Sequence, residues 1–201
     1  SVRLVDLLDE ATLRAQSAVR EKNPDMPEEL REQIAQSVGV GAIKYADLST
    51  ERIKDYVFDW SRMLSFEGNT GPYLQYAHAR ICSILRKAGD DGVRLAKELD
   101  MDRLPEDGRI SLAHPAERAL GLELMEFGVA VRSAGTGLQP HRLCTYLYEL
   151  ATKFTAFFEA CPVLKAETPE LRESRLLLCG ATRRTLALSL ELLGIRAPER
   201  M

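Results

Sequence analysis

Phe66-Glu-Gly-Asn-Thr-Gly-Pro-Tyr-Leu-Gln-Tyr-Ala-His-Ala-Arg80 predicts a tight loop that leads directly into a helix. Gly68-Asn69-Thr70-Gly71 has the composition of a turn, because Gly and Asn tolerate the backbone angles of a sharp bend. Either Asn69 or Thr70 can cap the helix, since both side chains accept a hydrogen bond from a free backbone N–H. Pro72 suits the first helical turn, where a missing N–H removes no hydrogen bond.

The helix is predicted to run to about Ala88, where Gly89 can end it in a left-handed conformation. At about 100° per residue, one stripe of it is apolar and is predicted to face a core. This stripe consists of Leu74, Ala77, Ile81, Ile84, Leu85 and Ala88. The neighbouring stripe carries Tyr73, Tyr76, Arg80, Ser83 and Lys87.

Two aromatic rings one turn apart, followed by cations, form a surface that suits single-stranded nucleic acid. The rings of Tyr73 and Tyr76 can stack on unpaired bases while the cations neutralise phosphates. The alternative is a core helix with two boundary tyrosines whose hydroxyl groups reach water. Periodicity alone leaves both interpretations open.

The other periodic segments also predict helices, so the fold class is all-α. Their ranges are about Val5–Val19, a second helix through Ile34 to about Val38, a short helix Asp90–Asp100, and three long helices at about His114–Ala134, Pro140–Ala160 and Pro169–Leu193. The three long helices and the Tyr73 helix predict a helical bundle, preceded by smaller connecting helices. A short strand around Val2–Val5 is the one exception to a helical chain.

Three further segments lack a clear helical pattern. Gly39–Ala46 is rich in glycine, but it lacks the full pattern of a phosphate-binding loop, so close helix packing is the better interpretation. Tyr56–Leu64 is apolar and aromatic, and we expect it to be a buried join between two parts of a larger protein. Asp102–Ser111 is polar and predicts a loop.

Bulk composition gives little support for nucleic-acid binding, because the formal net charge of the 201 residues is −3. Any such site must come from local clusters of cations, such as Arg172, Arg175, Arg183 and Arg184. The four cysteines are far apart, so we expect reduced thiols in a core and neither disulfides nor a zinc site. The three histidines show no metal-ligand spacing. No apolar run is long enough to span a bilayer, and we expect no signal peptide.

Several long strings resemble the arginyl-tRNA synthetase family, in the right order along essentially the whole chain. They are Gly41–Leu48, Phe66–Arg80, Pro140–Ala151, Phe157–Leu164, Arg175–Leu186 and Leu192–Met201. This resemblance implies the carboxy-terminal part of a class I arginine–tRNA ligase. Residues 1–65 would be the end of the catalytic region with connecting helices that contact the tRNA stem. Residues 66–201 would be the helical anticodon-binding domain.

The resemblance also implies a cytoplasmic enzyme that joins arginine to tRNA-Arg with ATP and Mg, through an arginyl-adenylate. The family's catalytic motifs, a His-x-Gly-His element and a Lys-Met-Ser-Lys-Ser-like loop, do not occur in this chain. We therefore expect no catalytic residue, metal or cofactor within the segment, which should be inactive alone. Its expected partners are tRNA-Arg and a catalytic domain on its amino-terminal side, with neither membrane nor DNA.

The resemblance assigns anticodon contacts to Tyr73, Tyr76 and Arg80, and to Met201 as the family's terminal residue. The alternative for Met201 is a docked terminus that only completes the packing. Lys87, Arg183 and Arg184 are candidates for contacts with the tRNA backbone.

Two other functional hypotheses remain at this point. One is a stand-alone helical module derived from a synthetase that binds a protein partner. The other, weaker one is a different class I synthetase with a related bundle, such as the cysteinyl enzyme.

Overall fold

A computed structural model describes residues 3–22, 24–100 and 110–201, and over these residues the chain forms helices without a β-strand. The helices are α1 (Leu4–Lys22), α2 (Glu28–Ser49), α3 (Trp60–Met63), α4 (Gly71–Lys87), α5 (Asp90–Asp100), α6 (Pro115–Met125), α7 (Phe127–Gly137), α8 (Pro140–Ala160) and α9 (Pro169–Leu192). The all-α prediction is confirmed. The strand considered around Val2–Val5 is wrong for its described part, because Leu4 and Val5 belong to α1.

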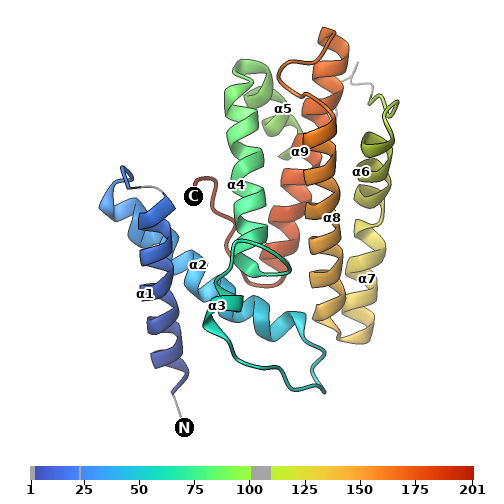
Figure 1. Ribbon diagram of the computed structural model, residues 1–201. Coiled ribbons are helices and arrows are strands. Elements are labelled where there is room, and N and C mark those ends of the chain that lie inside the picture. The colour runs from blue at the N-terminus through green and yellow to red at the C-terminus, as the bar shows by residue number, and fades with distance from the viewer. Residues whose placement is uncertain (1–2, 23, 101–109) are drawn as a thin grey trace.

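The bundle is built on α4, α8 and α9, with α5, α6 and α7 packed around them (Figure 1). Its largest fully buried side chains include Leu74, Ile81, Leu147, Phe154, Phe157, Leu176 and Leu177. Each such side chain contributes about 1.5–3 kcal/mol by leaving water. The α1–α2 hairpin lies at the side of the bundle, and α2 joins the two parts because it contacts α1, α4 and α8.

Three hydrogen bonds hold the loop before α4. Thr70 is the helix cap: its hydroxyl accepts a hydrogen bond from Tyr73 N (3.2 Å) and donates to Ser65 O (2.6 Å). The buried hydroxyl of Tyr45 in α2 lies 2.6 Å from Asn69 Oδ1, and burial raises its pKa well above the ordinary value. The predicted helix end is also confirmed, since Gly89 has φ +73° just after α4.

Glycines let α1, α2 and α4 approach closely. A Cβ on Gly39 would lie 2.7 Å from the Ala11 backbone in α1, and a Cβ on Gly71 would lie 2.8 Å from Gly41 O. Gly39–Ala46 is therefore continuous helix, and the close-packing interpretation is confirmed. The predicted end of this helix near Val38 is wrong, because tertiary packing outweighs the low helix propensity of glycine.

The single helix predicted over His114–Ala134 is two helices, α6 and α7. At Glu126 between them the backbone has φ −74° and ψ −8°, and its N–H donates to Glu123 O in a tight turn. The N-terminus of α6 is capped by His114, whose Nδ1 accepts from Ala116 N (3.1 Å). Asp102–Ser111, the predicted loop, lies mostly outside the described residues.

The segment between α2 and α4 is mostly exposed within the 201 residues, so its burial as a join in a larger protein stays a prediction. Ile53 and Val57 are 81% and 82% exposed, and Tyr56 and Phe58 are also exposed. Only its end turns inward, where Met63 is buried. The segment therefore presents apolar side chains to the outside.

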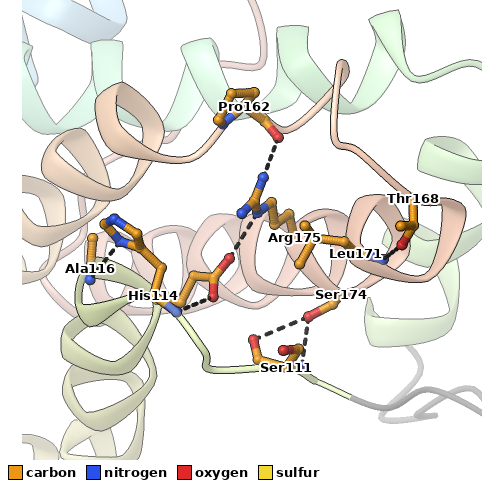
Figure 2. Close-up of polar contacts among 9 residues, drawn as sticks. Ser111, His114, Ala116, Pro162, Thr168, Leu171, Ser174 and Arg175 are labelled. Atoms are coloured by element: carbon orange, nitrogen blue, oxygen red, sulfur yellow. Dashed lines mark hydrogen bonds and ion pairs between the residues drawn. The ribbon is translucent and has the colours of Figure 1, made fainter.

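A buried ion pair connects α6, α9 and the loop that follows α8. The Glu117 side chain is completely buried, and its Oε1 accepts from Arg175 Nε at 2.8 Å. Arg175 Nη1 also donates to Pro162 O at 2.8 Å (Figure 2). Burial acts to raise the pKa of Glu117, but hydrogen bonds from Arg175 and His114 N and the Arg175 charge outweigh it, so this pKa lies below its ordinary value.

The four cysteines are buried free thiols, as the sequence predicts. Burial raises the pKa of Cys144 and of Cys179 to about 12. Both side chains are therefore neutral near pH 7 and act as small apolar groups in the core.

Candidate nucleic-acid interface

A groove of about 740 Å³ runs between α4, the α1–α2 turn and the carboxy-terminal tail. It is lined by Pro24, Asp25, Met26, Pro27, Leu30, Tyr76, Ala79, Arg80, Ser83, Arg86, Lys87, Arg200 and Met201. Four residues predicted from the sequence thus line one groove: Tyr76, Arg80, Lys87 and Met201. They come from the middle and the end of the chain.

The groove is locally cationic in a chain whose net charge is negative. Arg80, Arg86, Lys87 and Arg200 bring four positive charges to it, and Asp25 is the acidic side chain in the lining. Such a cluster can neutralise phosphates even though the whole chain cannot attract nucleic acid by its net charge.

Tyr76 provides an accessible aromatic ring beside these charges. The residue is 41% exposed, and its ring meets the ring of Phe66 edge-on, with centroids 6.3 Å apart and an interplanar angle of 81°. The contact with Phe66 helps to orient the ring, and the exposed part of the residue belongs to the lining of the groove.

Tyr73 does not line this groove. It is half-buried against the bundle core, and its ring packs on Tyr148 of α8 with centroids 5.9 Å apart. Arg80 lies between the two regions, because its guanidinium carbon is 4.6 Å from the centroid of the Phe158 ring while the residue also lines the groove. The two tyrosines therefore do not form one continuous platform.

The tail after α9 is fastened along α2 and α4 through its main-chain carbonyl groups. The first two are those of Gly194, which accepts from Lys44 Nζ (2.6 Å), and Arg196, which accepts from Gln75 Nε2 (2.8 Å). Further along, Pro198 O lies 2.9 Å from His78 Nδ1, and Glu199 O accepts from Arg86 Nη1 at 3.2 Å. The terminus is thus docked over its whole length.

Met201 ends this tail in an apolar contact. The half-buried residue packs against the small apolar core between α1 and α2, which consists of Ala15, Val19, Ile34, Ala35 and Val38. The same residue lines the groove. A docked terminus and a groove-lining position therefore occur together.

The cations of α9 lie elsewhere and are engaged within the fold. Arg184 donates to Leu99 O at the end of α5, and Arg172 donates to Ala88 O and pairs with Asp91. Arg183 is half-buried and, like Arg184, does not line the groove. The cluster suggested by the sequence is thus not a continuous exposed patch.

Arg86 and the turn residues Pro24–Pro27 line the groove but are not among the candidates predicted from the sequence. Arg86 directly precedes Lys87, which is predicted from the sequence, so adjacency to that candidate is a signal that could have identified it. The turn lies about fifty residues before Tyr76 and carries no local signal for a role beside α4. Only the tertiary packing of the α1–α2 hairpin brings it there.

Among the described residues, no group of three or more His, Cys, Asp or Glu side chains is placed to hold a metal ion. None of the helices in the described part of the chain is long and apolar enough to cross a membrane.

Two family models together match most of the chain. The model described as DALR anticodon binding domain matches residues 74–201. The model described as tRNA synthetases class I (R), catalytic domain, matches residues 1–60.

Curated relatives give the same result. The chain is 54% identical over 200 residues to the arginine–tRNA ligase of Thermobifida fusca, and 55% identical over 202 residues to that of Frankia casuarinae. Each match covers 100% of this chain but only 33% and 32% of the relative, so the chain spans about a third of their length. Similarity at this level favours a ligase segment over the stand-alone protein-binding module and over a cysteinyl enzyme.

Solved structures agree in three dimensions. The arginyl-tRNA synthetase of Thermus thermophilus superposes with a TM-score of 0.86 at 44% identity, and that of Plasmodium falciparum with 0.85 at 36%. These matches cover the whole chain and 32% and 34% of the two structures. The chain belongs to the arginyl-tRNA synthetase family, and residues 74–201 are its DALR anticodon-binding domain.

Proposed function

We propose that the groove between α4, the α1–α2 turn and the tail binds the anticodon loop of tRNA-Arg. The observation that carries this proposal is the joint lining of one groove by Tyr76, Met201 and four cations in a chain of net charge −3. Anticodon loops present unstacked bases and closely spaced phosphates, which are the chemical groups that aromatic rings and guanidinium ions bind.

Each side chain has a distinct role in this proposal. Tyr76 stacks on a base, and Met201 makes an apolar contact with a base. Arg80, Arg86, Lys87 and Arg200 neutralise phosphates or meet base edges. Tyr73 packs on Tyr148 of α8 beside the groove. It either flanks the anticodon loop or stabilises the position of α8, whose Phe158 contacts Arg80. Arg183 and Arg184 can approach only RNA that extends beyond the groove.

We divide the chain into residues 1–65, the end of a catalytic region with its connecting helices, and residues 66–201, the anticodon-binding domain. The reaction of the proposed ligase, in which arginine is joined to tRNA-Arg with ATP and Mg in the cytoplasm, then belongs to a catalytic domain on the amino-terminal side. This segment has no catalytic role of its own in the proposal. The exposed Ile53 and Val57 would lie against that catalytic domain.

The 201-residue chain is expected to bind a transcribed tRNA-Arg with saturable fluorescence anisotropy. Because about four cations take part, a plot of log K against log salt concentration should have a slope of about −3 to −4. The control RNA keeps the tRNA body and carries an unrelated anticodon loop, and it should bind more weakly. Equal affinity for both RNAs would contradict anticodon recognition.

Deleting Met201 is expected to raise the Kd for tRNA-Arg roughly fivefold, about 1 kcal/mol, because a half-buried apolar side chain completes only part of its burial on binding. The melting temperature should change little, since four other contacts hold the tail. Met125→Ala is the matched control: it truncates a methionine that is 78% exposed on α6, outside the groove. A Kd equal to that of the control would leave Met201 with a packing role only.

A further inference from the structure

Gln75 is a completely buried polar residue on α4, close to the groove but not part of its lining. Its Nε2 donates to Ser37 O of α2 at 3.1 Å and to Arg196 O of the tail at 2.8 Å. One amide group of α4 therefore binds two other segments, one 38 residues before it and one 121 residues after it in sequence.

The orientation of this amide is determined by its acceptors. Ser37 Oγ is a third oxygen within 3.3 Å of Nε2, whereas Oε1 is buried without a hydrogen-bond partner among the described residues. Leaving a buried acceptor without a partner is costly. Ser37 O and Arg196 O are backbone carbonyl oxygens, which can only accept, so the amide nitrogen and not the oxygen must face both segments.

The other contacts to the tail differ from this one. Lys44 and Arg86 are exposed, so water competes for their hydrogen bonds, and neither of them joins three segments. His78 is buried and holds Pro198 O from α4. Gln75 thus lies at the start of the tail and ties it to α2 and α4 at the same time.

We propose that Gln75 is the positioning residue for the end of the tail: it fixes the tail against α2 and thereby places Met201 in the groove. This inference rests on the proposed function, because the placement of Met201 matters for binding only if the groove binds RNA. Gln75 touches no RNA itself in this proposal and acts through the tail.

Gly41 offers an independent way to disturb the same contact. A Cβ at this position would lie 2.9 Å from Gln75 Nε2 and 3.1 Å from Oε1, too close for both groups to stay in place. Gly41→Ala keeps the amide but displaces it. The variant should fold, because alanine favours the interior of α2 more than glycine does.

The position of Met201 can be followed directly by NMR of methionine methyl groups. The chain has five methionines, and the Met201 signal is identified by its loss in the Met201 deletion. In Gln75→Leu and in Gly41→Ala we expect this signal to move toward the position of an exposed methionine, while the signal of Met125, which is 78% exposed on α6 outside the groove, stays in place. Tyr146→Phe is the control: it removes one buried hydrogen bond, to Glu123 O of α6, and should leave the Met201 signal in place.

A double-mutant cycle then tests whether Gln75 acts through the tail. Gln75→Leu should weaken binding of the tRNA-Arg transcript at least as much as deletion of Met201, about fivefold or more. The double variant should bind the transcript with nearly the same affinity as Gln75→Leu alone, because the Met201 contact is already lost in that variant. Multiplied effects would mean that Gln75 acts independently of Met201 and would overturn the proposal.

The remaining outcomes are also decisive. An unmoved Met201 signal in both variants would overturn the proposal even if their affinity fell. If Gln75→Leu does not fold, Gly41→Ala decides the question in the same two measurements. If the unmodified chain fails to bind tRNA-Arg, the proposed function fails, and the methyl signals alone still show whether Gln75 holds the tail in place.

Discussion

Replacing Arg175 by methionine is expected to lower the free energy of unfolding by about 3–5 kcal/mol, the largest effect on stability that we expect of a single substitution here. The change leaves the carboxylate of Glu117 completely buried without its cation. It also removes the donor to Pro162 O, so the loop between α8 and α9 loses a contact.

Chemical denaturation monitored by circular dichroism measures this effect. The control is Arg94→Met, which removes partly exposed ion pairs with Glu98 and Glu173 and should cost only about 0–1 kcal/mol. Adding Glu117→Gln to Arg175→Met should recover part of the loss, because the buried charge is removed as well. A loss in Arg175→Met no larger than in the Arg94 control would mean that the buried pair does not stabilise the bundle.

The pH dependence gives a second check with a defined sign. In the unmodified chain the pKa of Glu117 is lowered, so the stabilisation by this carboxylate is present above the ordinary glutamate pKa, about 4.3, and is lost as the pH falls through the lower folded-state value. Without Arg175, burial dominates and the pKa of Glu117 rises. Protonation of Glu117 on acidification then removes the unpaired buried charge, so the variant is less destabilised at low pH. The difference in unfolding free energy should therefore be larger at pH 7 than at pH 4.

Tyr76→Leu is expected to weaken binding of tRNA-Arg by about 1–3 kcal/mol, which is the cost of one lost aromatic–base stack. The fold should persist, because the residue is 41% exposed and leucine can still contact Phe66. Fluorescence anisotropy gives the change in Kd, and thermal melting shows whether the variant is folded.

Tyr56→Leu is a closely matched control, because Tyr56 is also 41% exposed and lies outside the groove. It should bind the RNA with unchanged Kd. Tyr73→Leu should instead lower stability as well, since Tyr73 packs on Tyr148. If Tyr76→Leu binds as well as the Tyr56 control, the tyrosine is no stacking residue and the anticodon must bind elsewhere.

Local signals in the sequence were sufficient to predict α4 and its loop. Thr70, Pro72 and Gly89 act within a few residues of themselves, through a cap, a fixed φ and a positive φ, and the helix has the predicted limits. The break at Glu126 could not be predicted in this way, because no proline or glycine stands at that position. Nor could the continuation of α2 through Gly39 and Gly41, which depends on contacts with α1 and α4.

The candidate site was predictable only in part, for a similar reason. Helical periodicity places Tyr73 and Tyr76 about 60° apart around α4. It carries no information on which other parts of the chain pack beside each tyrosine. The packing of α8 against Tyr73, and of the α1–α2 turn near Tyr76, separates the two rings. The exposed Ile53 and Val57 illustrate the same limit, since apolar composition predicts burial without naming the surface that provides it.

The tail is held through main-chain carbonyl groups, and this has a consequence for how the family can diversify. Every residue has a main-chain carbonyl group, so these four contacts do not depend on the side chains at the positions that accept them. The contacts come from Lys44, Gln75, His78 and Arg86. Substitutions of Arg200, which lines the groove, can therefore change the chemistry of the groove while these carbonyl contacts persist. If the groove binds the anticodon loop as proposed, its preference among loops can change at such positions while the helices that hold the tail stay the same.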